Sequence, residues 1–189
     1  MKITKNSNSP RVSLVTFASQ SSIRIYCDEY DSSAALHDAI DKLTYKTKDS
    51  FTNIKDGLIK GHKALSSRGC GRPKAKRMIV LVTDGKANRG LGGFQAIREK
   101  AREIRDTNTT IIAIGIGGNI KYDLLKNLTG GDGNVFTSTT FNDKKLFELA
   151  SNAMNQQQCQ SKFLSLVFFL YKYFFIFKFS IWVYKQGLL

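Results

Sequence analysis

Residues 77–83, RMIVLVT, form an almost continuous apolar run with the length of a β-strand. Such a run is typical of a strand that is buried on both faces of a parallel sheet. A second run of this kind, TTIIAIGIGG, occupies residues 109–118. Between them, residues 93–108 repeat apolar side chains at helical spacing and carry charges on the opposite face. This order of strand, helix and strand is the strongest constraint on the fold.

The rest of the chain from Arg11 onward continues the alternation. The pattern predicts a strand pair at residues 11–19 and 22–30 and a short strand at 134–136. Helices are predicted at 32–43, 50–65, 121–128 and 143–154, the first with Ser32 or Ser33 as its N-cap. Together these elements predict the α/β class, as an open, doubly wound and mostly parallel sheet with helices on both faces.

The composition divides the chain into three parts. At 189 residues and 42% hydrophobic content, one globular domain is expected, and we place it at residues 11–160 after a linker at 1–10. Residues 161–189 form a hydrophobic tail. Eleven of the 22 residues in 163–184 are aromatic, which suits a membrane anchor, although Lys172 and Lys178 interrupt the stretch. The alternative is a spurious tail, such as translated non-coding sequence.

The net charge of +14 favours acidic partners. Residues 68–105 contain eleven basic and three acidic side chains, and therefore contribute +8. A solvated surface is one interpretation of this stretch, and a contact surface for sulfated glycans, nucleic acid or an anionic membrane is the other.

The cysteines Cys27, Cys70 and Cys159 lack the spacing of a zinc site. Because their number is odd, either one thiol is free or a partner cysteine lies outside this sequence. Asn108 and Asn127 open two N-glycosylation sequons. Residues 1–10 lack the apolar core of a signal peptide.

The buried strand at 77–83 leads directly to Asp84 and Gly85. Ligands of open α/β sheets bind at the carboxyl ends of the strands, so the Asp84 carboxylate is expected at a binding edge. Gly85 allows the chain to turn sharply there. Thr52 offers a hydroxyl in the polar turn, Thr52-Asn53, that opens the helical segment at 50–65. A hydroxyl and a carboxylate from separate loops suit a hard cation such as Mg²⁺, although both residue types are also common in caps and turns.

Three motifs in this order, RVSLVTFAS, FTNIKDGL and VTDG, resemble the von Willebrand factor type A domain, an α/β adhesion and matrix module. The resemblance covers about residues 11–159. It implies a divalent cation, usually Mg²⁺, at the carboxyl edge, with Thr52 and Asp84 as ligands. We predict that Asn53, Gly85 and Arg89, from the neighbouring loops, contact the bound ligand.

The chain departs from the family at its first strand. In the family this central strand ends in Asp-x-Ser-x-Ser, which supplies a carboxylate and two hydroxyls to the metal. Here no apolar strand precedes Arg11, and Lys5 stands at the Asp position of KNSNS. We therefore expect a sheet that lacks its first central strand, with a gap in the core, and a metal site that binds Mg²⁺ weakly or not at all.

The resemblance implies a non-enzymatic, extracellular binding module, secreted or at the cell surface. Its expected partners are matrix or cell-surface proteins such as collagen, with sulfated glycans as a further possibility. No catalytic constellation of Ser, His and acid can be assembled from the sequence. One alternative is an α/β domain that binds nucleotide or nucleic acid through GLGGF at 90–94 and the basic stretch. Another is a truncated product without a function of its own.

Overall fold

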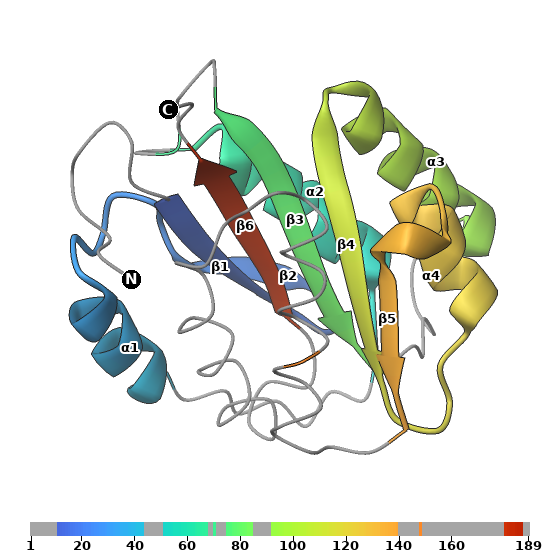
Figure 1. The fold of residues 1–189 in the computed structure, drawn as a ribbon, viewed down its shortest axis with the longest axis horizontal. Coiled ribbons are helices and arrows are strands. Elements are labelled where there is room, and N and C mark those ends of the chain that lie inside the picture. Colours follow the sequence, from blue (N-terminus) through green and yellow to red (C-terminus); the bar gives the residue numbers. More distant parts are fainter. Residues whose placement is uncertain are drawn as a thin grey trace.

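The computed structural model describes residues 11–43, 51–67, 70, 75–84, 92–139, 148 and 180–186. Six strands in the order β2-β1-β6-β3-β4-β5 form one sheet (Figure 1). The strands are β1 (Arg11–Phe17), β2 (Ser21–Ile25), β3 (Lys76–Thr83), β4 (Thr109–Ile116), β5 (Val135–Ser138) and β6 (Ser180–Gln186). The predicted α/β class is confirmed.

Four of the six strands run in one direction. The pairs β3–β4 and β4–β5 are parallel. Strand β6 is antiparallel to both β1 and β3, so β1 runs the same way as β3. Strand β2 pairs antiparallel with β1 at the sheet edge. The carboxyl ends of β1, β3, β4 and β5 therefore lie along one edge, toward which the arrows of β3 and β5 point in Figure 1.

The expected gap in the middle of the sheet is not present, and this prediction is wrong for the described structure. Strand β6, from the C-terminal tail, lies between β1 and β3. Its register pairs Trp182 with Leu14 on one side and with Val80 on the other. Two strands without a partner would each expose a row of unpaired backbone groups, and β6 supplies a partner to both.

Part of the hydrophobic tail predicted at 161–189 lies in β6. The last residues of the stretch 163–184, from Ser180 onward, belong to β6, whereas residues 163–179 lie outside the described part of the chain. Among the described residues, no helix is both long and apolar enough to cross a membrane.

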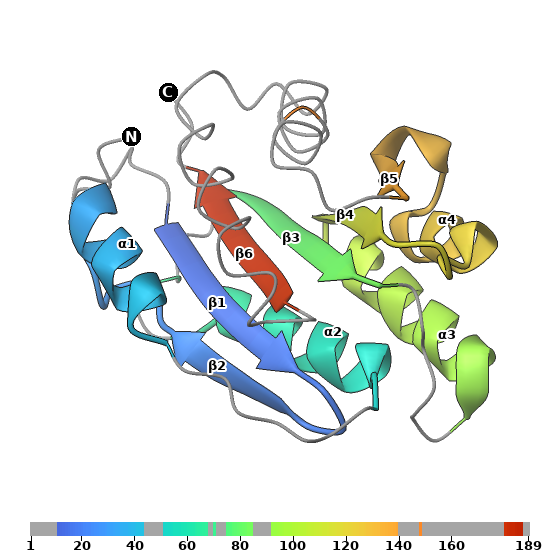
Figure 2. The same ribbon diagram turned by 90° about the horizontal axis from the view of Figure 1, so that it is seen from below.

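Helices lie on both sides of the sheet, as expected. They are α1 (Ser33–Asp41), α2 (Ile54–Leu65), α3 (Gly93–Asp106) and α4 (Tyr122–Thr129), followed by a 3-10 turn, η1 (Asp132–Asn134). Figure 2 shows α2 and α3 against one face and α1 on the other side, near β1. Ser32 is the N-cap of α1, because its hydroxyl accepts a hydrogen bond from the Ala35 amide at 3.2 Å. The helix predicted at 143–154 lies outside the described residues apart from Glu148.

One hydrophobic core joins β1, β3 and β4 to α2, α3 and α4. Its strand members include Phe17, Ile79, Leu81 and Ile111, all fully buried; its helix members are Ile54, Leu58, Ala64, Leu65, Ile97, Ala101, Ile104, Leu124, Leu125 and Leu128. Burying a side chain of the Leu or Phe size contributes roughly 1.5–3 kcal/mol. The residues that alternate with these core positions along β3 and β4 point to the other face of the sheet, and they are also buried; Val80 and Ile112 are examples. The prediction that these two strands are covered on both faces is confirmed.

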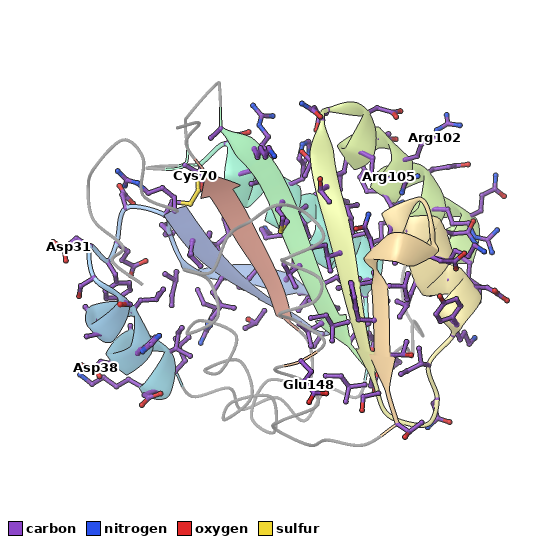
Figure 3. All side chains as sticks on the ribbon, viewed as in Figure 1. Asp31, Asp38, Cys70, Arg102, Arg105 and Glu148 are labelled. Carbon is purple, nitrogen blue, oxygen red and sulfur yellow. A yellow bond between two sulfur atoms is a disulfide. The ribbon has the colours of Figure 1, made fainter. Side chains whose placement is uncertain are left out.

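A disulfide links Cys27, just after β2, to Cys70, between α2 and β3, with a Cα–Cα distance of 5.2 Å. The sulfur bridge is visible in Figure 3 beside the label of Cys70. The bond joins the segment that follows β2 to the segment between α2 and β3, at the edge opposite the carboxyl ends of β1 and β3. Cys159 lies outside the described residues.

Candidate binding edge

The candidate site is built on the edge at which β1, β3 and β4 end. We call this edge the rim and define it by residues 17–19, 51–53, 83–84, 94 and 116–122. Because β6 pairs Ser180 with Thr16 of β1 and with Val82 of β3, the last residues of these two strands are held level with each other. The end of β1 and the end of β3, which Asp84 directly follows, therefore lie at the same edge of the sheet.

Asn53 attaches the start of α2 to the end of β1. Its backbone amide donates to the Ala18 carbonyl at 2.7 Å, and its side-chain Nδ2 donates to the Ser19 carbonyl at 3.3 Å. Its Oδ1 accepts from the Asp56 amide at 3.1 Å, which makes Asn53 the N-cap of α2. Both ends of this side chain are therefore used in positioning the loop. Its predicted contact with a ligand stays a prediction.

Asp56 makes a second connection between the start of α2 and the β1–β2 turn, and the sequence patterns above did not indicate it. Its Oδ2 accepts a hydrogen bond from the Ser21 amide at 2.6 Å, and its carbonyl accepts one from the Ser21 hydroxyl at 3.0 Å. An acidic residue three positions after an Asn N-cap is the available sequence signal, because side chains in the first helical turn can reach back to free amides. Through Asn53 and Asp56, the start of α2 is fixed to the β1–β2 turn.

Thr52 and Asp84 are the proposed metal ligands, and both lie on the rim. Thr52 directly precedes the N-cap of α2 and is only 1% exposed, whereas Asp84 directly follows β3 and is partly buried. Gly85 and Arg89, the other predicted ligand contacts in this region, lie outside the described residues.

The donor set does not fit a complete magnesium shell. Nowhere in the described parts of the chain do three or more His, Cys, Asp or Glu side chains gather into a group that could hold a metal ion. Mg²⁺ requires near-octahedral oxygen coordination, and one carboxylate with one hydroxyl leaves most of that shell to water. Asp56, the acidic residue at the start of α2, is already bonded to Ser21.

Exposed aromatic residues mark the rim more clearly than its polar residues do. Phe51 is 42% exposed before α2, Phe94 is 37% exposed in the first turn of α3, and Tyr122 is 42% exposed as the first residue of α4. The Lys121 ammonium lies 4.5 Å from the centroid of the Phe94 ring, so the starts of α3 and α4 touch. Each of the three helices on this face of the sheet thus begins beside an exposed aromatic ring.

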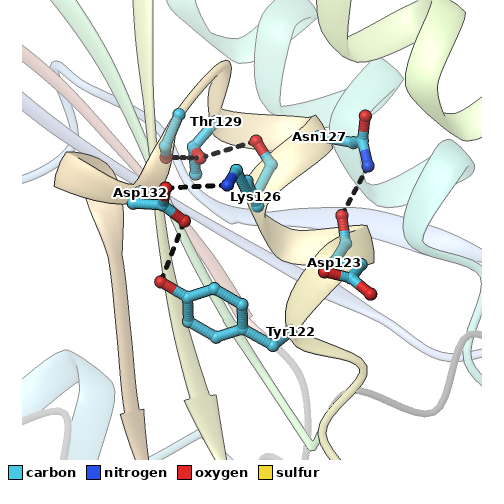
Figure 4. Close-up of polar contacts among 7 residues, drawn as sticks. Tyr122, Asp123, Lys126, Asn127, Thr129 and Asp132 are labelled. Atoms are coloured by element: carbon cyan, nitrogen blue, oxygen red, sulfur yellow. Dashed lines mark hydrogen bonds and ion pairs between the residues drawn. The ribbon is translucent and has the colours of Figure 1, made fainter.

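Polar contacts hold Tyr122 in place. Its hydroxyl donates to Oδ1 of Asp132 at 3.1 Å, and the Lys126 ammonium lies 2.8 Å from Oδ2 of the same carboxylate (Figure 4). The hydrogen bond from Lys126 lowers the pKa of Asp132, and the bonds to Asp132 raise the pKa values of Lys126 and Tyr122. These groups are exposed, so the contacts orient the ring more than they stabilise the fold.

The basic stretch at 68–105 is only partly a free surface. Within α3, Arg98 and Arg102 are exposed, and Lys100 forms an ion pair with Glu103. Arg105 instead donates from Nη1 to the Asn127 carbonyl at 3.1 Å and to the Leu128 carbonyl, at the C-terminal end of α4. A cation in this position satisfies free carbonyls and opposes the negative end of the helix dipole. Arg105 is therefore a structural residue.

The fold is therefore an α/β sheet whose carboxyl edge carries a Thr-Asn turn, a strand-terminal Asp and exposed aromatic rings. The chain belongs to the von Willebrand factor type A domain family, whose model matches residues 1–151. Strand β6 lies beyond the matched residues.

Curated relatives include the mouse inter-alpha-trypsin inhibitor heavy chain H3, 33% identical over 82 residues, which is 42% of this chain. The mouse collagen alpha-5(VI) chain is 24% identical over 147 residues, or 78% of this chain. The chain spans only 9% and 5% of the lengths of these two proteins.

Among solved structures, proximal thread matrix protein 1 from the mussel byssus matches with a TM-score of 0.64 at 21% identity; the match covers 86% of this chain and 37% of the mussel protein. Another structure of the mussel protein, with a zinc-occupied metal-ion-dependent adhesion site, matches with a TM-score of 0.58 at 23% identity and covers 93% of this chain and 36% of that one. At these identities the likeness shows the fold. The bound zinc belongs to the mussel protein.

Proposed function

We propose that the chain is a non-enzymatic protein-binding module of an extracellular matrix or cell-surface protein, and that its partner binds at the rim. Membership of the von Willebrand factor type A family supports an interaction module, and the relatives named above include a collagen chain and a thread matrix protein. The disulfide between Cys27 and Cys70 agrees with an oxidising, extracellular compartment. Collagen or a similar matrix protein is the proposed partner.

The exposed rings of Phe51, Phe94 and Tyr122 carry this proposal. Aromatic side chains dominate the energy of protein interfaces, because they bury a large area with few rotatable bonds. Lys121 adds a positive charge beside Phe94, which favours a partner with apolar groups and acidic residues. The sheet and the helix starts hold all three rings on one edge.

The binding test compares exposed aromatic residues at opposite edges. Phe94→Ala and Tyr122→Ala remove rim rings, whereas Tyr26→Ala removes a ring that is 37% exposed just after β2, at the edge opposite the rim. We expect each rim variant to weaken binding to immobilised triple-helical collagen at least tenfold in surface plasmon resonance, and Tyr26→Ala to leave it unchanged. Equal affinities for all four proteins would overturn the rim as the contact surface, and an absence of any binding would overturn collagen as the partner.

We further propose that Mg²⁺ binds weakly or not at all, so that partner binding does not need the metal. The support is the donor set of Thr52 and Asp84, which includes a single carboxylate. Isothermal titration of the full chain with MgCl₂ tests this directly, with Asp84→Ala as the control. Micromolar affinity that disappears in Asp84→Ala would contradict the proposal.

Sulfated glycans are a second proposed partner, through the outer face of α3. Arg98 and Arg102 are exposed one helical turn apart on this face. We expect the double variant Arg98→Glu, Arg102→Glu to elute from a heparin column at clearly lower salt than the unaltered chain. Unchanged elution would remove this partner and leave the rim proposal intact.

A further inference from the structure

The two sequons at Asn108 and Asn127 lie in different structural settings. Asn108 forms the turn between the end of α3 and the start of β4, and it is exposed. Its φ of 58° places it in the left-handed region, where Asn is tolerated better than most residues. Its backbone amide donates to the Arg105 carbonyl at 2.9 Å, whereas its side-chain amide makes no hydrogen bond to any residue that the structure describes.

The hydroxyl residue of this sequon is also partly accessible. Thr110, which supplies the hydroxyl of the sequon, is partly exposed at the start of β4, and the intervening Thr109 is buried. A sugar attached to Asn108 would therefore extend from an exposed turn, and the side-chain contacts of the core would not change.

Asn127 is also exposed, but its side chain and its sequon have a different setting. It lies within α4, and its Nδ2 donates to the Asp123 carbonyl at 2.6 Å (Figure 4). The hydroxyl residue of its sequon, Thr129, is only 4% exposed, and its Oγ1 lies 3.1 Å from the Lys126 carbonyl and 2.7 Å from the Gly131 carbonyl. The Asn127 carbonyl accepts the hydrogen bond from Arg105. Modification here would disturb a side chain that is already engaged.

The position of Asn108 also suits the proposed binding edge. Asn108 directly precedes β4, whereas the rim follows the other end of this strand. Eight residues of strand separate the two ends by about 23 Å. A glycan on Asn108 would leave the rim open to a partner.

We propose that Asn108 is the occupied N-glycosylation site of this chain and that Asn127 is not modified. In this reaction, the Asn108 amide nitrogen attacks C1 of the first sugar of a lipid-pyrophosphate-linked oligosaccharide. The bond from nitrogen to C1 forms, the bond from C1 to the pyrophosphate oxygen breaks, and the amide proton passes to a base of the transferase. The inference rests on the proposed extracellular location.

The test uses the full chain, directed into the secretory pathway of mammalian cells by an added signal sequence. We expect intact mass spectrometry to show one N-glycan, which peptide-N-glycosidase removes. Thr110→Ala should abolish it while Asn108 stays in the turn, Thr110→Ser should restore it, and Asn127→Gln should leave it in place. Asn108→Gly, which accepts the positive φ, provides a second variant without the acceptor amide.

Two outcomes would overturn the inference. One is a secreted chain without a glycan, and the other is a glycan that Asn127→Gln removes. The mass measurement does not involve the binding partner. If no glycan is found but the rim still binds its partner, the glycosylation inference has failed. If the glycan is found but the rim does not bind, the proposed function has failed.

Discussion

Two regions of the sheet are built in different ways. From β3 to β5, the chain alternates strand and helix, and each strand pairs in parallel with the next strand along the sequence. From β2 to β6, the pairs are antiparallel, and β6 comes from the far end of the chain to lie between β1 and β3. The first region depends on local connections, and the second depends on a pairing across more than 160 residues.

The comparison shows why one region could be predicted from the sequence and the other could not. The runs at 77–83 and 109–118 and the amphipathic helix between them specify buried parallel strands through periodicity alone. No periodicity specifies that Trp182 should pair with Leu14, because register across distant segments depends on which partner is available. An apolar, aromatic and β-branched segment such as SIWVY is equally typical of a membrane-facing stretch and of a buried strand.

The candidate site shows the same division. Thr52 and Asp84 could be placed on one edge from the sequence, because Thr52 lies at the start of a predicted helix and Asp84 directly follows a predicted strand. The exposed rings of Phe51, Phe94 and Tyr122 on the rim could not be predicted. In sequence, an exposed aromatic residue at a helix start looks like any other apolar residue of that helix. The disulfide was missed because an odd number of cysteines does not specify which two pair.

The largest effect should come from a core residue of the region that contains β6. Phe17 at the end of β1 is fully buried and belongs to the core that includes β3, β4 and their helices. Phe17→Ala should lower the free energy of unfolding by about 3–5 kcal/mol in urea denaturation. Tyr26→Ala, on an exposed ring, should change it little. A loss near that of the control would mean that the two regions do not share one core.

Removal of the disulfide should have the next largest effect. Cys27 and Cys70 are separated by 43 residues, and the bond constrains the unfolded chain within that loop. The double variant Cys27→Ser, Cys70→Ser should lose about 2–4 kcal/mol of stability. Cys159→Ser provides the control for a single thiol. If reduction of the unaltered chain leaves its melting temperature unchanged, the bond does not support this region.

A smaller effect is expected in the region from β3 to β5. Arg105→Ala removes the donor to two carbonyls at the end of α4 and should cost about 1–2 kcal/mol. Arg102→Ala, from the same helix but exposed, should be near neutral (Figure 3). Equal losses for both variants would indicate a general effect of charge rather than a cap on α4.

The smallest expected effect is a pH dependence from His62. Its Nε2 lies 3.2 Å from the Thr107 hydroxyl, and burial, with further contributions from Arg77 and Lys100, lowers its pKa. Below the unfolded pKa of about 6.5, the unfolded chain binds the proton more readily, so stability should fall as the pH decreases from 7.5 toward 5. His62→Gln should make the melting temperature less dependent on pH across this range. An identical slope in the variant would exclude His62 as a source of the dependence.

Hydrogen–deuterium exchange of the full chain, followed by mass spectrometry, tests most directly whether the sheet is completed by its own C-terminal strand. A central strand is hydrogen-bonded on both sides and exchanges mainly through global unfolding. The amides of residues 180–186 should be protected to the same degree as those of β1 and β3. Rapid exchange of 180–186 while β3 and β4 remain protected would contradict this prediction.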